Sequence, residues 1–142
     1  MLKKIPTIIN PELLKILMEM GHGDEIVIGD GNFPAASMGQ RLVRCDGNNA
    51  CELFDAILEL LPLDQYVENP LALMSVVPGD NVTPTIWAEF KAIATKHEPE
   101  NCSFEFVERF AFYDRAKSAY AIVSSGETAL YANIILKKGV VR

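Results

Sequence analysis

Helical and strand-like segments alternate along the chain, and this alternation limits the possible folds more than any other feature of the sequence. Residues 11–20 and 50–61 carry apolar side chains at helical spacing. Residues 25–30 and 71–77 are short apolar runs bounded by turn residues, as is typical of buried strands. Strands that alternate with helices predict an α/β layered domain with a mostly parallel sheet.

Proline and polar caps mark where the expected helices begin. Asn10 followed by Pro11 is a typical helix start, and Thr83 followed by Pro84 repeats that pattern before a helix that includes residues 86–93. A short helix is expected over residues 109–118. The remaining strands are expected at residues 41–44, 104–107, 120–123 and 131–136.

Length and composition exclude several classes of protein. A chain of 142 residues predicts one domain over residues 1–142. Its 13 Lys and Arg against 19 Asp and Glu give a net charge of −6, which argues against nucleic acid or an anionic membrane as the main partner. No apolar run approaches a membrane span, and the N-terminus lacks the apolar core of a signal peptide. We therefore expect a soluble protein.

The three cysteines, Cys45, Cys51 and Cys102, are odd in number and show no C-x-x-C spacing. That usage fits a reducing, cytoplasmic compartment better than a disulfide framework or a zinc site. The chain also lacks the motifs of dinucleotide-binding, P-loop, α/β-hydrolase and zincin proteins. His22 with Asp24 and Asp30 makes a poor set of metal ligands, so we expect no metal.

Only two histidines are available for chemistry that needs a group titrating near neutral pH. His22 lies between two glycines in a turn, which is either a turn without a role or a way to present the imidazole. The strand that follows ends at Asp30, and ligands collect at the carboxyl ends of strands in open α/β sheets. His97 lies near the end of a predicted helix, where an imidazole interacts favourably with the negative end of the helix dipole.

Four other polar residues are candidates for a site, and two of them, Asp30 and Arg109, have two interpretations each. Asp30 either closes its strand with an Asx turn or faces a crevice, where it binds sugar hydroxyls or holds His22 in one tautomer. Arg109 is either a surface ion-pair residue or a ligand-binding residue whose planar guanidinium donates hydrogen bonds to two vicinal hydroxyls. Tyr131 and Asn133, two residues apart on a predicted strand, share one face and are expected to share a pocket. The aromatic residues at 110–113 are more often core than a ligand platform.

Three blocks of sequence resemble the L-fucose mutarotase and D-ribose pyranase family, which interconverts ring and anomeric forms of free monosaccharides. The blocks are GHGDEIVIGDGNFP at 21–34, VERFAFYDRA at 107–116 and SGETALYANIILKKGV at 125–140. The resemblance implies a three-layer α/β/α fold that assembles into homo-oligomeric rings, often decamers, with sites at subunit contacts.

The resemblance also implies roles for individual residues. His22 matches the family's proton-donating histidine, and Tyr131 is a candidate second catalytic group at the anomeric oxygen. The substrate-binding positions that the resemblance implies are Asp30, Arg109, Tyr120, Tyr131, Ala132 and Asn133. Arginine at 109 favours the fucose branch, because the ribose branch carries histidine there. Tyr120 stands where members vary between tyrosine and phenylalanine, which bears on pyranose and furanose exchange.

These matches lead to the hypothesis of a cofactor-independent L-fucose mutarotase with His22 as general acid at the ring oxygen. Gly31, Asn32 and Ala36 depart from the residues that some fucose members carry. Two alternatives stay open at this point: a D-ribose pyranase, and a non-catalytic monosaccharide-binding module on the same fold.

Overall fold

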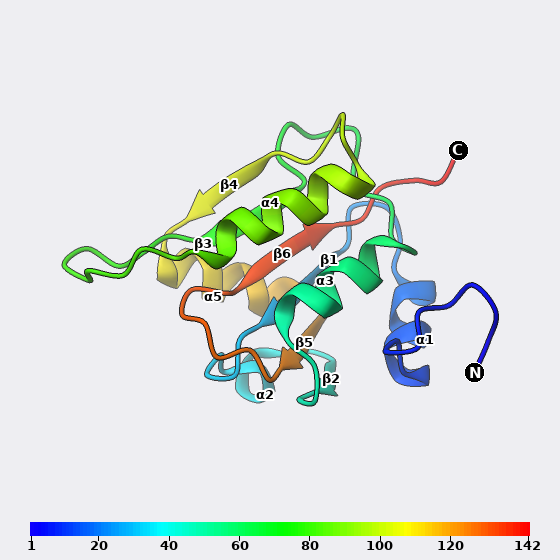
Figure 1. Cartoon of the computed structure of the whole chain (residues 1–142), viewed down its shortest axis with the longest axis horizontal. Coiled ribbons are helices and arrows are strands. Elements are labelled where there is room, and N and C mark those ends of the chain that lie inside the picture. The colour runs from blue at the N-terminus through cyan, green and yellow to red at the C-terminus, as the bar shows by residue number, and fades with distance from the viewer.

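Five helices and six strands follow one another in nearly the predicted order in the computed structural model, which describes residues 1–142 (Figure 1). The helices are α1 (Pro11–Glu19), α2 (Ala35–Met38), α3 (Ala50–Leu58), α4 (Ile86–His97) and α5 (Arg109–Ser118). The strands are β1 (Glu25–Gly29), β2 (Leu42–Cys45), β3 (Leu71–Met74), β4 (Phe104–Val107), β5 (Ala121–Ser125) and β6 (Ile134–Lys137).

The six strands form one sheet in the order β2-β5-β1-β6-β3-β4. Strand β6 is antiparallel to both of its neighbours, β1 and β3, whereas every other pair in the sheet is parallel. The prediction of a mostly parallel sheet is confirmed. Five strands therefore end where β6 begins, and we call this the carboxyl end of the sheet and the opposite one the amino end.

Side chains that alternate along each strand build two separate cores. In β3, Leu71 and Leu73 pack in a core with α1, α3 and α4, whereas Ala72 and Met74 pack in a second core with α2 and α5. Helices thus cover both faces, and the three-layer α/β/α arrangement is confirmed (Figure 1). Each fully buried Leu or Ile contributes about 1.5–3 kcal/mol, so the two cores hold the sheet rigid beneath its loops.

Side-chain caps explain where two helices begin. The side chain of Asn10 accepts a hydrogen bond from the Leu13 amide at 2.8 Å, so the predicted start of α1 is confirmed. The Glu108 carboxylate accepts from two amides of the first turn of α5, both at 3.0 Å. The predicted cap at Thr83 is wrong, because α4 begins at Ile86 after Thr85, which makes no side-chain cap.

Other local features also differ from the predictions, and β3 ends at Met74 rather than at 77. Helix α2 was not predicted, because a four-residue helix is too short to show a periodicity. Strand β6 begins at Ile134 rather than at 131, since Tyr131 has a φ of 58° and its backbone is left-handed. Tyr131 and Asn133 therefore precede the strand. No helix has both the length and the apolarity that a membrane crossing requires.

Candidate functional site

A cavity of about 300 Å³ opens at the carboxyl end of the sheet. Its lining comes from the segments that follow β1, β3 and β4 and from the segment that precedes β6. Because β6 runs antiparallel to the other strands, its entry meets their exits there. The lining residues are Asp30, Asn32, Phe33, Met74, Val77, Asp80, Arg109, Tyr113, Leu130, Tyr131 and Asn133.

Asp30 is buried in the wall of this cavity, with 8% of its surface exposed. Its Oδ1 accepts a hydrogen bond from the Asn32 amide at 2.9 Å, so the predicted Asx turn is present in a residue that also faces a cavity. Burial raises the pKa of Asp30 above its ordinary value, although hydrogen bonds from Asn32 and Asn133 oppose that shift. Such a carboxylate is a ready acceptor for a ligand hydroxyl.

Of the two neighbouring residues Ala132 and Asn133, only Asn133 lines the cavity. Asn133 is buried, and its Oδ1 accepts from the Asp30 amide at 2.8 Å, which joins the entry of β6 to the exit of β1. Ala132 is fully buried in the core and is not among the cavity-lining residues. Tyr131 and Asn133 do line one cavity, as predicted, although a turn rather than strand alternation places them there.

Tyr131 is held at three points, two in the loop between β3 and α4 and one in the first turn of α4. Its hydroxyl donates to Asp80 Oδ2 at 2.5 Å and accepts from the Val77 amide at 3.3 Å, and its carbonyl accepts from Trp87 Nε1 at 2.9 Å. The hydrogen bond to Asp80 is the main reason why the pKa of Tyr131 is raised. A non-glycine residue with positive φ is strained, and these contacts over-determine its position.

Arg109 is the first residue of α5 and lies on the cavity wall. Its Nε donates to the Tyr113 hydroxyl at 3.2 Å, and no carboxylate lies within ion-pair distance of its guanidinium. The interpretation as a surface ion-pair residue is therefore wrong. The aromatic residues beside it divide: Phe112 is buried core, Tyr113 lines the cavity, and Phe110 is 65% exposed.

His22 lies at the other end of the sheet, in the turn before β1. Its Nε2 lies 2.9 Å from Asp64 Oδ1, and its ring packs on Tyr66 with centroids 5.3 Å apart. The side chain is 44% exposed. Five residues of β1 separate His22 from Asp30 by roughly 15 Å. Within a single chain, the prediction that Asp30 holds the imidazole is wrong.

Asp64 is a site residue that the sequence analysis missed. It is 3% exposed and lies 42 residues from His22 along the chain, in the connection between α3 and β3. Burial by itself would raise its pKa, but hydrogen bonds from the Tyr66 amide and from His22 outweigh burial, so the pKa of Asp64 lies below its ordinary value. Only the fold brings this carboxylate to the imidazole.

Tyr120 also lies at the amino end of the sheet and does not line the cavity. It precedes β5, its hydroxyl donates to Glu19 Oε2 at 2.8 Å, and the Arg41 guanidinium lies 3.9 Å from the ring centroid. The hydrogen bond to Glu19 is the main reason why the pKa of Tyr120 is raised. The structure therefore groups Tyr120 with His22 and separates it from Asp30.

His97 is the last residue of α4, as predicted, and its imidazole is mostly buried. Its Nε2 lies 2.6 Å from Asp55 Oδ1, and Lys96 Nζ lies 2.8 Å from the same atom. These contacts tie α4 to α3 and are the main reason why the pKa of Asp55 is lowered. His97 has a structural role, far from the cavity.

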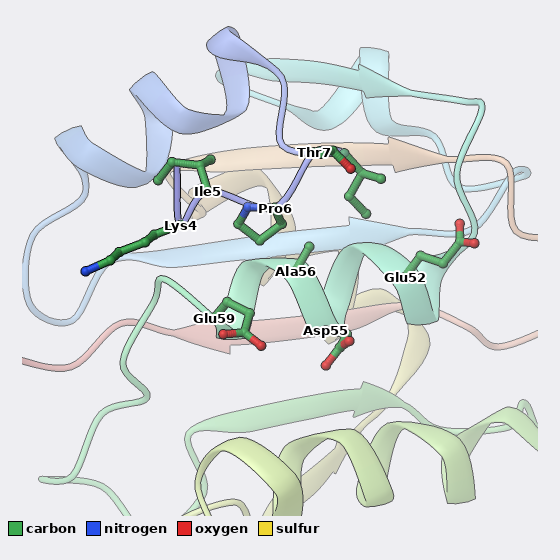
Figure 2. Close-up of a pocket in the computed structure, with 9 residues that line it drawn as sticks. Lys4, Ile5, Pro6, Thr7, Glu52, Asp55, Ala56 and Glu59 are labelled. Atoms are coloured by element: carbon green, nitrogen blue, oxygen red, sulfur yellow. The ribbon is translucent and has the colours of Figure 1, made fainter. Parts of the chain in front are cut away.

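A second cavity, of about 570 Å³, lies between the N-terminal segment and α3 (Figure 2). Its acidic side chains are Glu52 and Asp55 of α3 and Glu59, which caps the end of that helix, and Lys4 lies on the opposite wall. Asp55 is already paired with Lys96 and His97, and no group of His, Cys, Asp and Glu side chains in the chain is arranged to hold a metal ion. None of the site residues predicted from the sequence lines this second cavity.

Comparisons with known proteins agree over the whole length. Residues 3–141 match the RbsD / FucU transport protein family. The chain is 52% identical to the L-fucose mutarotase of Actinobacillus pleuropneumoniae over 140 residues, which covers 99% of this chain and 97% of the relative. It is 48% identical to the fucose mutarotase of Homo sapiens over 147 residues, covering 98% and 94%. The crystal structure of the fucose mutarotase in complex with L-fucose from Streptococcus pneumoniae is 54% identical, with a TM-score of 0.94 over 99% of this chain and 100% of that one.

Proposed function

Because the chain belongs to the RbsD / FucU family, we propose that it is an isomerase that interconverts the α and β anomers of free L-fucose. Identity above 50%, over nearly the full length, to a protein crystallised with L-fucose is the observation that carries this proposal. The cavity at the carboxyl end supports it, because about 300 Å³ is the lower end of the range for small-molecule sites.

The reaction needs a proton added to the ring oxygen and a proton removed from the anomeric hydroxyl. The C1–O5 bond then breaks, an aldehyde forms at C1, the C1 carbon rotates, and the ring closes on the other face. Both protons return in the closing step, so no cofactor is consumed. A well-placed acid or base contributes about 10²- to 10⁴-fold to such a step.

The carboxyl end of the sheet supplies the groups that orient the sugar. Asp30 accepts hydroxyl hydrogens, and the guanidinium of Arg109 offers a planar fork to two neighbouring hydroxyls. Asn133 fixes the backbone of Asp30, and Tyr131 acts at the anomeric hydroxyl. This arrangement suits a neutral substrate, for which hydrogen bonds rather than a basic pocket give specificity.

His22 supplies the proton to the ring oxygen in this proposal, and it comes from a second copy of the chain. Asp64 engages Nε2 of the ring, which leaves Nδ1 for the sugar. Its 44% exposure leaves the imidazole accessible to another protomer, whereas roughly 15 Å of strand separates it from the cavity of its own protomer. A homo-oligomer, which we propose to be a decameric ring, brings the two ends together.

We also propose that the enzyme works in the cytoplasm. Its three cysteines are unpaired thiols, and Cys45 is buried. Unpaired thiols of this kind persist in a reducing compartment.

Saturation-transfer NMR tests the proposed activity directly. When the α signal of L-fucose is inverted or saturated, the perturbation should reach the β signal much faster with the protein than in buffer alone. Parallel measurements on D-ribose separate the two enzyme alternatives, because a ribose pyranase would accelerate ribose exchange more. Binding of L-fucose with no faster exchange would contradict the enzyme and would identify a sugar-binding module.

A further inference from the structure

We propose that Asp80 is a positioning residue of the mutarotase, accepting the phenolic proton of Tyr131 while Tyr131 accepts the proton of the anomeric hydroxyl. This inference rests on the proposed function and deepens it. It adds a carboxylate from the loop between β3 and α4 to the machinery at the carboxyl end of the sheet.

The hydrogen bonds around Tyr131 determine what its hydroxyl can do. The only hydrogen of the phenol is donated to Asp80 Oδ2 at 2.5 Å, and one acceptor position of the oxygen is used by the Val77 amide. A sugar hydroxyl in the cavity therefore meets an oxygen that can accept a hydrogen bond and has none to donate. Removal of a proton from the anomeric hydroxyl requires that polarity.

Asp80 itself is free of competing partners. Its carboxylate makes no ion pair, and the hydroxyl of Tyr131 is its one side-chain hydrogen-bond partner. The neighbouring Asp30 differs, since its Oδ1 is engaged by the Asn32 amide. Asp80 is thus the carboxylate of the cavity that is in direct contact with the tyrosine.

Two further contacts hold Tyr131 in place beside Asp80. Trp87 Nε1 holds the carbonyl of Tyr131 at 2.9 Å, and the Val77 amide holds its hydroxyl. Val77 precedes Asp80 and Trp87 follows it, so the loop between β3 and α4, together with the start of α4, fixes the backbone and the hydroxyl of Tyr131 and supplies the proton acceptor. The left-handed backbone of Tyr131 is a strained conformation of the kind that persists where its surroundings over-determine it, often at active sites.

The proton balance is complete without another reactant. In ring opening, the O1–H bond of the sugar breaks, its proton moves to Tyr131, and the former phenolic proton moves to Asp80. The electron pair of O1–H forms the C1=O1 double bond, the C1–O5 pair moves to O5, and O5 takes a proton from His22. In ring closing, Asp80 returns a proton to Tyr131, Tyr131 returns one to O1, and His22 regains its own.

The test compares Asp80→Asn with the matched control Asp114→Asn, which makes the same charge change at an exposed residue of α5. Asparagine keeps a carbonyl oxygen to accept from Tyr131 but cannot hold the relayed proton. We expect Asp80→Asn to lower the exchange rate at saturating L-fucose on the order of 10²-fold. Its affinity for L-fucose should change by less than about threefold, and Asp114→Asn should match the wild type in both respects.

A double-variant comparison shows whether Asp80 acts through Tyr131. In a Tyr131→Phe background, Asp80→Asn should cause no further loss, because the relay is already broken. If the rate losses of the two single variants multiply in the double variant, Asp80 does not act through the tyrosine. A wild-type exchange rate in Asp80→Asn would overturn the role of Asp80 and leave the proposed function standing. A wild-type protein that fails to accelerate exchange at all would instead overturn the proposed function.

Discussion

At the carboxyl end of the sheet Asp30 lies buried among neutral hydrogen-bond partners, whereas at the amino end Asp64 lies as deeply buried beside the imidazole of His22. Burial dominates at Asp30 and raises its pKa. At Asp64 the hydrogen bonds from Tyr66 and His22 outweigh burial, and the pKa is lowered.

This difference separates two tasks between the two ends of the sheet. The carboxyl end is a concave set of hydrogen-bonding groups around a cavity, suited to holding a polar ligand. The amino end presents a half-exposed imidazole on a fixed carboxylate, suited to moving a proton. Neither end is sufficient by itself for the proposed reaction, which is why a second protomer enters the proposal.

Mixing two inactive variants gives the largest expected effect. His22→Ala removes the proton donor and Asp30→Asn removes a sugar-binding carboxylate, so each homogeneous protein should lose about 10²- to 10⁴-fold in anomer exchange. When the two variants are co-expressed, sites that combine the intact cavity of one with the intact His22 of the other should restore a measurable fraction of the rate. Saturation-transfer NMR on the purified mixture reads this out.

The control for that mixture is His22→Ala co-expressed with a chain that carries both substitutions, which has no intact His22 and should stay inactive. If the first mixture also stays inactive while its chains assemble together, His22 and Asp30 do not meet across protomers, and the division between the two ends fails.

Replacing one arginine at each end of the sheet should change the affinity for L-fucose by an intermediate amount at the carboxyl end and not at the amino end. Arg109→Lys replaces the planar fork at the cavity with a point charge, and we expect affinity for L-fucose to fall about tenfold. Arg41→Lys, beside Tyr120 at the amino end, should leave affinity unchanged. Titration calorimetry with L-fucose compares them. Equal losses would mean that Arg109 does not contact the sugar.

Stability should change in opposite directions when the two buried aspartates are neutralised. The raised pKa of Asp30 means that its ionised form costs stability, a cost that appears as pH rises above the ordinary pKa of the carboxyl and through its folded pKa. Asp30→Asn should therefore raise the free energy of unfolding at pH 7 by about 1 kcal/mol. The lowered pKa of Asp64 means that its ionised form contributes stability, which is lost only as pH falls through its folded pKa.

Asp64→Asn should consequently lower the free energy of unfolding at pH 7 by about 1–2 kcal/mol. Denaturant unfolding of the wild type and both variants, at equal protein concentration and at several pH values, measures the two effects. Shifts of the same sign at neutral pH would show that the two carboxylates are not held differently.

The smallest effect is expected at Tyr120. Tyr120→Phe removes an exposed hydrogen bond to Glu19 and keeps the ring under Arg41, so the free energy of unfolding should stay close to that of the wild type. Pyranose anomer exchange should stay within about threefold of wild type, with furanose signals followed in the same spectra. A loss as large as that of His22→Ala would place Tyr120 in the chemistry at the amino end.

Much of this fold could be predicted from local sequence patterns. Strand β4 and helix α5 have the predicted bounds, because apolar runs and a charged helix start are visible over a few residues. The start of β6 was missed since a left-handed turn at Tyr131 breaks the pattern without a glycine. Thr83 was wrongly predicted as a cap, since the chain stays non-helical up to Thr85 and the loop after β3 contacts Tyr131, which lies far away in sequence.

The site residues likewise divide into those that local sequence predicts and those that it does not. Asp30 and Arg109 follow strands directly, so their place at the carboxyl end could be predicted from strand direction alone. Asp64 and Asp80 could not be, because their partners lie 42 and 51 residues away and no local spacing connects them.

Strand β6 has a consequence for the order of synthesis. It is the only strand that joins the β2-β5-β1 half of the sheet to the β3-β4 half, and it leaves the ribosome after all five strands that it unites. Until β6 is made, β1 and β3 expose unpaired, apolar inner edges to solvent and to other nascent chains. The interval before β6 emerges is therefore when a nascent chain would most need a chaperone.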